Sequence, residues 1–178
     1  MKTLTLLRHA KSSWDDPAAR DFDRPLNRRG RKAARAMGKA MREQGIAFDH
    51  ILASPAARVV GTLEDFADGY GGPIEPAFDH RVYMATAATL LKLVQAADDK
   101  AERLLVVGHN PGMEALALLL TRDDDDGLRS EMSAKYPTAT LAEIALPVDH
   151  WRDVALGTGQ LARFIRPRDL DPALGPED

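Results

Sequence analysis

The sequence predicts an α/β protein with a mostly parallel sheet, and three observations support this prediction. Short apolar segments alternate with longer segments whose apolar residues recur at helical spacing. The clearest strand, 103–107, is almost entirely apolar, as expected of a central parallel strand. Several strands are followed at once by a helix start, which is typical of βα units. The 178 residues fit one domain, which we place over 1–166, with a Pro- and Asp-rich tail over 167–178.

Composition excludes several classes of function. The formal net charge of −3 argues against general nucleic-acid binding. The absence of cysteine excludes disulfides, thiolate zinc sites and a cysteine nucleophile. The N-terminal segment offers only Leu4, Leu6 and Leu7 before Arg8, too little for a signal peptide or a membrane span. We therefore expect a cytoplasmic monomer with neither a membrane nor a nucleic acid as partner.

The first predicted strand, 3–7, is rich in Leu and Thr and ends abruptly in Arg8-His9. Side chains just past the carboxyl ends of parallel strands line the ligand crevice of such sheets. Arg8 supplies a fixed cation there, and His9 supplies a titratable nitrogen that serves as nucleophile or base. This pair suits phosphate chemistry. The charged, Pro-containing segment 15–25 predicts a loop over the same edge of the sheet.

The first predicted helix has Asn27 as its N-cap and stops at Gly45. Its apolar stripe includes Met37 and Met41, and its opposite face is basic. That face is either a solvated surface or a docking surface for an acidic partner protein, and the sequence leaves both open. Its basic residues are Arg28, Arg29, Arg31, Lys32, Arg35, Lys39 and Arg42.

A second strand over 48–53 leads into a second helix. For this helix we predict Ser54 as the N-cap and Pro55 as the first helical residue. Such a start places Arg58 in the first turn, near the carboxyl edge of the sheet. Arg58 can then point into the same crevice as Arg8.

Several elements give weaker signals. The connector 69–76 is rich in turn residues and offers little more than Ile74 as a strand. A third helix is predicted with Thr86 as its N-cap. Two further strands, over 139–146 and 160–166, are predicted at an edge of the sheet.

A second histidine follows the strand 103–107. His109 stands just before a helix that runs through Leu120, and the backbone N–H groups and dipole of a helix start favour an anion. The aspartate run 123–126 predicts a solvated loop rather than a metal site, since consecutive acids repel and cannot all face one ion.

Four residues are thus expected to converge: Arg8, His9, Arg58 and His109. Two guanidinium groups can bind a phosphoryl group bidentately and neutralise its oxygens, which replaces a metal ion. Neighbouring arginines disfavour the cationic form of His9, so its neutral ring is available as a nucleophile. They would also repel a metal cation, so we expect no metal and no cofactor.

Four sequence blocks resemble the histidine phosphatase superfamily (the phosphoglycerate-mutase-like clan), and within it the small SixA-type phosphohistidine phosphatases. They occur in family order over about the first 120 residues. The blocks are Leu-Leu-Arg-His-Ala-Lys-Ser-Ser-Trp at 6–14, Arg-Pro-Leu-Asn-Arg-Arg-Gly-Arg-Lys-Ala-Ala at 24–34, Ala-Ser-Pro-Ala-Ala-Arg at 53–58 and Val-Val-Gly-His-Asn-Pro-Gly at 106–112.

The resemblance implies a three-layer α/β/α sandwich and a catalytic cycle in which His9 is phosphorylated. It also implies which residues complete the phosphate pocket. These are Arg8, Arg58 and His109, with Ser12 and Asn110 as looser matches to positions that line the pocket.

Two departures from the family pattern bear on function. Ala10 stands where the signature usually has glycine. No clear general acid is present, because Asn110 stands where one branch has aspartate and the segment 78–83 lacks the glutamate of another. Asp79 is the nearest candidate for the acid.

We therefore predict a metal-independent phosphatase acting through phospho-His9, on phosphohistidine or another phosphorylated protein side chain. A small-molecule phosphomonoesterase is the alternative enzyme. A non-catalytic phosphate-binding or interaction module is the third hypothesis, although such a module has no need of the nucleophile.

Overall fold

The computed structural model describes residues 1–123 and 125–176 and contains one six-stranded sheet. Its strands are β1 (Lys2–Arg8), β2 (His50–Ala53), β3 (Pro76–Phe78), β4 (Arg103–Gly108), β5 (Leu141–Leu146) and β6 (Gln160–Ile165). They are ordered β3-β2-β4-β1-β5-β6. The strands β3, β2, β4 and β1 run parallel, β5 pairs antiparallel with β1, and β6 pairs antiparallel with β5 at the edge of the sheet. The predicted α/β fold, with two further strands at one edge, is confirmed.

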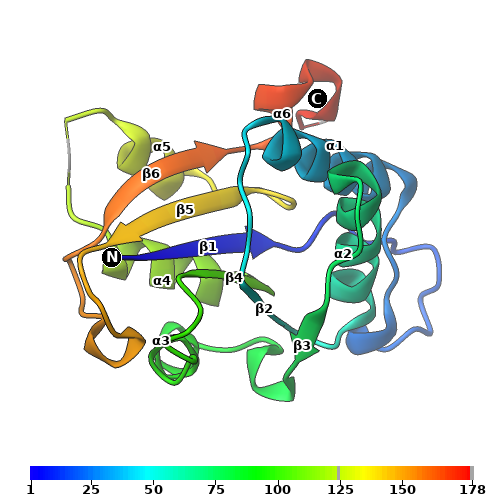
Figure 1. The fold of residues 1–178 in the computed structure, drawn as a ribbon. Helices are drawn as coiled ribbons and strands as arrows, with labels where there is room; N and C mark the ends of the chain where they lie inside the picture. The colour runs from blue at the N-terminus through cyan, green and yellow to red at the C-terminus, as the bar shows by residue number, and fades with distance from the viewer. Residues whose placement is uncertain (124, 177–178) are drawn as a thin grey trace.

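Helices cover both faces of the sheet. The α-helices are α1 (Arg28–Glu43), α2 (Ala57–Tyr70), α3 (Ala87–Gln95), α4 (Gly112–Leu120), α5 (Leu128–Ala134) and α6 (Pro167–Leu170). The short 3-10 turns are η1 (Asp21–Asp23), η2 (His80–Val82), η3 (Trp151–Asp153) and η4 (Pro172–Leu174). α1 and α2 pack on one face, and α3, α4 and α5 pack on the other (Figure 1). The three-layer sandwich is therefore confirmed.

Side-chain alternation along β1 divides the core into two halves. Leu4 and Leu6 are buried on the face covered by α3, α4 and α5. Leu7 is buried on the opposite face, in one cluster with Leu105 of β4 and the apolar stripes of α1 and α2. Because both faces are covered, the central strands are apolar almost throughout.

Two predicted N-caps are present. The Asn27 side chain accepts a hydrogen bond from the Gly30 N–H at 2.8 Å and begins α1. The Thr86 hydroxyl accepts one from the Thr89 N–H at 3.2 Å and begins α3. Both satisfy a backbone donor that the first helical turn leaves unpaired.

The predicted start of α2 is wrong. α2 begins at Ala57, with Ala56 as its N-cap, so neither Ser54 nor Pro55 is part of the helix start. The Ser54 hydroxyl instead hydrogen-bonds His109 on the neighbouring strand end, at 2.8 Å, and accepts from the Ala56 N–H at 3.3 Å, ahead of the helix. Arg58 nevertheless lies in the first turn, as expected.

Two elements differ from the sequence-based expectation. β3 forms at Pro76–Phe78 rather than around Ile74, which packs into the core beside α2. Proline is tolerated at the first residue of this edge strand because one side of the strand has no partner. α5 was not expected at all. Within the aspartate run, Asp123 pairs with Arg129, and Asp124 lies outside the described residues.

The C-terminal segment folds back over α1 (Figure 1). Leu174 of η4 packs against a small apolar cluster that contains Ala33 and Ala34 of α1. Arg166 ties the start of α6 to α5 through an ion pair with Glu131 at 2.9 Å. No helix in the described part of the chain is both long and apolar enough to cross a bilayer.

Two glycines allow α1 and α2 to touch backbone to backbone. A Cβ on Gly38 would lie 2.0 Å from the carbonyl oxygen of Phe66, and one on Gly69 would lie 1.9 Å from that of Arg35. No side chain fits at such distances. This close packing fixes α2, and therefore the first-turn Arg58, relative to the sheet.

Candidate active site

Parallel pairing of β1 with β4 places the ends of these strands side by side. Arg8 is in register with Gly108, and the backbone N–H of His9 donates to the Gly108 carbonyl at 3.0 Å. His109 follows directly, and its ring centroid lies 5.2 Å from that of His9. Arg58 reaches the same point, with its Nε 3.3 Å from His9 Nε2. The structure thus brings the four predicted residues to one edge of the sheet.

His9 is held in one orientation and one protonation state. Its Nδ1 lies 2.7 Å from the Ala10 carbonyl oxygen, which can only accept a hydrogen bond, so Nδ1 carries the proton. Nε2 therefore presents its lone pair, and Arg58 Nε–H donates to it. Burial lowers the His9 pKa to about 3, and the nearby charges of Arg58 and Arg8 act in the same direction. The ring is therefore neutral at physiological pH.

Ala10 replaces the usual glycine without disturbing the site. Its side chain is fully buried in a small apolar cluster with Leu26 and Ala33. Its N–H donates to the Thr62 hydroxyl at 2.9 Å, and that hydroxyl donates to the Arg58 carbonyl at 2.7 Å. These two hydrogen bonds connect the loop after His9 to the helix that carries Arg58.

His109 is positioned by Ser54. The two are joined by a 2.8 Å hydrogen bond between His109 Nε2 and the buried Ser54 hydroxyl. Tyr83 packs edge-on against the same ring, at 5.3 Å between centroids. Burial, followed by the charge of Arg58, lowers the His109 pKa to about 4. Its Nδ1 is buried and has no hydrogen-bond partner in the described part of the chain.

Arg8 is fixed by the segment between α5 and β5. One terminal nitrogen of its guanidinium donates to the Tyr136 carbonyl at 2.8 Å, and its backbone N–H donates to the Thr140 carbonyl at 3.1 Å. The N–H of Ala139, a residue in the left-handed region with φ 57°, donates to the carbonyls of both Arg8 and His9. Arg8 Nε is buried without a partner among the described residues.

Of the two looser candidates, Asn110 lies next to Arg8. The Asn110 amide donates to the Tyr136 carbonyl that also binds Arg8, and to Glu114 in the first turn of α4. Ser12 has a different role, since its hydroxyl accepts from the buried Arg24 at 2.8 Å. None of the hydrogen bonds described for Ser12 reaches the four converging residues.

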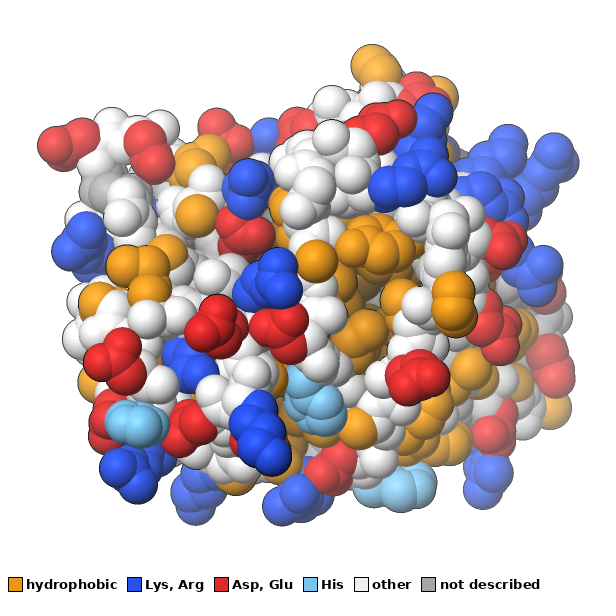
Figure 2. Space-filling model, viewed as in Figure 1, with side chains coloured by type: hydrophobic (Ala, Val, Ile, Leu, Met, Phe, Trp, Pro, Cys, Tyr) orange, Lys and Arg blue, Asp and Glu red, His pale blue; other side chains and the backbone are white. Residues whose placement is uncertain are grey.

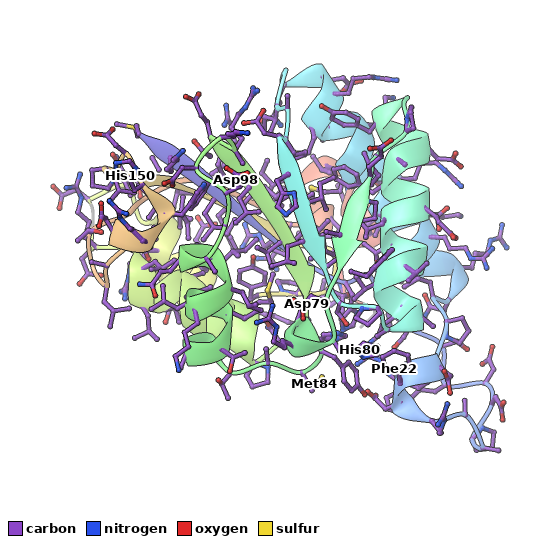
Figure 3. All side chains as sticks on the ribbon, turned by 60° about the horizontal axis from the view of Figure 1, so that its bottom comes forward. Phe22, Asp79, His80, Met84, Asp98 and His150 are labelled. Atoms are coloured by element: carbon purple, nitrogen blue, oxygen red, sulfur yellow. The ribbon has the colours of Figure 1, made fainter. Side chains whose placement is uncertain are left out.

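Asp21 is a site residue that the sequence did not single out. Its side chain accepts hydrogen bonds from Arg58 at 3.0 Å and from the Tyr83 hydroxyl at 2.5 Å. These bonds, that from Tyr83 above all, lower the Asp21 pKa. The loop that carries Asp21 thereby covers Arg58, and Figure 3 shows Phe22 and His80 meeting beside it, with ring centroids 5.9 Å apart.

Asp79, the candidate general acid, lies at the carboxyl end of the parallel strands (Figure 3). It forms an ion pair with Arg81. Its carboxylate accepts hydrogen bonds from the Arg81 side chain, the shortest at 2.6 Å, and from the Arg81 N–H. These bonds lower the Asp79 pKa, so the group is ionised. Among the described residues, no hydrogen bond joins Asp79 to His9, Arg58 or His109.

The arrangement is suited to an anion. Arg8 Nε and His109 Nδ1 are buried polar atoms that lack partners in the described part of the chain, and a bound phosphoryl oxygen would satisfy them. Negative charge would also raise the His109 pKa and favour a second N–H donor. No group of three or more His, Asp or Glu side chains within residues 1–123 and 125–176 is arranged to hold a metal ion.

Comparison with known proteins identifies the family. The model of the histidine phosphatase superfamily (branch 1) matches residues 4–83. An uncharacterized protein of Mycobacterium tuberculosis is 36% identical over 165 residues, which cover 91% of this chain and 100% of that protein. This chain belongs to the histidine phosphatase superfamily.

Similarity to solved structures identifies the branch of the superfamily. A candidate phosphohistidine phosphatase SixA from Agrobacterium tumefaciens has a TM-score of 0.76 at 30% identity, covering 93% of this chain and 98% of that one. The protein histidine phosphatase SixA complexed with tungstate shares the fold, with a TM-score of 0.77 at 21% identity over 95% of this chain and 99% of that one. Within the superfamily, the chain is of the SixA type.

The buried neutral histidines should make stability depend on pH. The folded-state pKa values of His9 and His109, about 3 and about 4, lie below the ordinary 6.5, so between pH 4 and 6.5 the unfolded chain binds more protons. Stability is therefore complete above pH 6.5 and is lost as the pH falls, by about 1.4 kcal/mol per pH unit for each histidine.

His109→Asn removes one of these contributions. From pH 6 to pH 5, its unfolding free energy, measured by urea denaturation, should fall about 1 kcal/mol less than that of the unmodified protein, slightly below the full slope because pH 6 is close to the unfolded pKa. Equal losses in the two proteins would show that His109 is not held neutral in the fold.

Proposed function

We propose that this protein is a metal-independent phosphatase that forms a phosphoryl intermediate on His9 and acts on phosphohistidine or another phosphorylated side chain of a protein. The observation that carries the proposal is the state of His9, a buried neutral imidazole whose Nε2 lone pair faces the Nε of Arg58 at 3.3 Å. A nucleophile ready for attack and a cation for the phosphoryl oxygens lie together.

The first step transfers the phosphoryl group to the enzyme. The Nε2 lone pair attacks phosphorus, and the N–P bond forms as the bond from phosphorus to the substrate nitrogen breaks. The leaving imidazole keeps that electron pair and takes a proton from solvent. The Nδ1–H of His9 stays bound to Ala10 and stabilises the positive charge that develops on the ring.

The second step restores the enzyme. A water molecule attacks phosphorus from the side opposite His9, and its lost proton passes to solvent. The bond between phosphorus and Nε2 breaks, its electron pair returns to the ring, and inorganic phosphate leaves. In both steps Arg8, Arg58 and His109 donate to the equatorial oxygens, where the transition state carries its charge.

The site favours substrates whose leaving group needs no acid. Asp79 and Asp21 are both held ionised by hydrogen bonds, from Arg81 in one case and from Tyr83 and Arg58 in the other. Neither has a proton to give at neutral pH. The imidazole of a phosphohistidine leaves readily, whereas the alkoxide of an alkyl phosphate requires protonation. We therefore infer that Asp79 is not a general acid.

Rapid acid-free quenching with a ³²P-labelled phosphohistidine peptide should trap an acid-labile, base-stable label on His9. His9→Ala should abolish the label and lower turnover by about 10³-fold or more while the protein stays folded. The matched control is His150→Ala, which removes an exposed histidine at the opposite end of the strands (Figure 3) and should leave the label intact. Label on a serine or an aspartate would refute the mechanism.

Substrates that differ in their leaving group should differ strongly in kcat/KM. We expect kcat/KM for phosphohistidine and aryl phosphates to exceed that for phosphoserine by about 10²- to 10⁴-fold, the usual contribution of a general acid. Asp79→Asn should change kcat for phosphohistidine by less than about twofold, because the carboxylate donates no proton. Comparable values for alkyl and aryl esters, with a large loss in Asp79→Asn, would make Asp79 the acid and favour a small-molecule phosphatase.

A further inference from the structure

A cavity lies beside Arg8, between the end of β1, the start of α1 and the C-terminal segment. Its volume is about 270 Å³, and Arg8 is part of its wall. Apolar side chains, including Pro137, Pro167 and Leu174, form much of the remaining wall. Arg8 therefore borders both this cavity and the predicted phosphate pocket.

Several basic side chains line the cavity. Lys11, Lys135 and Arg168 line it, and their side chains form no hydrogen bond or ion pair within the described part of the chain. The neighbouring Arg166, in contrast, is paired with Asp169 and with a glutamate of α5. Three cations around one hollow repel one another, and an anion placed among them would be attracted.

The size of the cavity indicates a small anionic group rather than a whole metabolite. Its volume lies just below the roughly 300–1,000 Å³ of ordinary small-molecule sites. An adjoining hollow lined by Arg28, Lys32 and Asp171 shares Leu174 with it. Figure 2 shows basic side chains gathered over α1, with acidic side chains over the neighbouring C-terminal segment. An extended peptide chain is long enough to contact both the cavity and the adjoining hollow, whereas a small metabolite is not.

We propose that this cavity is a subsite for an acidic side chain of the protein substrate, on a segment adjoining the phosphorylated residue. The proposal rests on the phosphatase function inferred above. With the phosphoryl group on His9, a carboxylate nearby in the substrate enters between Lys135 and Arg168, while its methylene groups contact the apolar wall. This subsite selects substrates by the charge that flanks the phosphohistidine.

The test compares two phosphohistidine peptides of equal length, one with flanking glutamates and one with glutamines. For the unmodified protein, kcat/KM should favour the glutamate peptide by about tenfold at low ionic strength, through KM, and the preference should decline with added salt. Lys135→Gln and Arg168→Gln should each reduce this ratio about three- to fivefold. The control Lys100→Gln, in the loop before β4 at the far end of the sheet, should leave the ratio unchanged.

A binding measurement separates this proposal from the phosphatase function. Fluorescence anisotropy should show that the unphosphorylated glutamate peptide binds the unmodified protein more tightly than it binds Lys135→Gln. Such binding without turnover of either phosphopeptide would support the subsite and refute the proposed function. Equal turnover of the two phosphopeptides, with equal binding of the glutamate peptide to the unmodified protein and to Lys135→Gln, would refute the subsite. That result would still support the phosphatase function.

Discussion

His9 lies buried at the end of β1 with its Nδ1–H bonded to Ala10 and its Nε2 facing Arg58, and the chemistry of the site depends on this placement. Removing the ring from water, next to guanidinium groups, makes its cation costly and keeps its lone pair available. The same burial leaves donors on Arg8 and His109 without partners in the described part of the chain. These two buried polar atoms are suited to contact an anion.

The sheet topology produces this arrangement. Because β1 and β4 are parallel neighbours, Arg8-His9 and His109 emerge at one edge, and the helix after β2 brings Arg58 to it. The segment that leads into β5, which pairs antiparallel with β1, also contacts the end of β1. The N–H of Ala139, just before β5, donates to the carbonyls of both Arg8 and His9, so this segment helps to fix the backbone of His9.

The sequence predicted most of the strands and helices, though not α5 or the place of β3, and it predicted the four converging residues, because these depend on local signals: apolar runs, caps and strand ends. It did not predict Asp21 or Tyr136, since their contacts with Arg58 and Arg8 join segments 37 and 128 residues apart. Ser54 was misassigned because a serine before a proline is also a good helix start. Its actual partner, His109, is 55 residues away.

The chemistry proposed for the site requires that His9 be neutral in the folded protein, with its proton on Nδ1. ¹⁵N NMR of histidine-labelled protein measures this directly, with His9→Asn to assign the resonance. We expect an Nδ1–H tautomer whose shifts stay constant from pH 7.5 down to about pH 4.5, because the His9 pKa is about 3. A ring that titrates near the ordinary pKa of 6.5, or that carries its proton on Nε2, would contradict it.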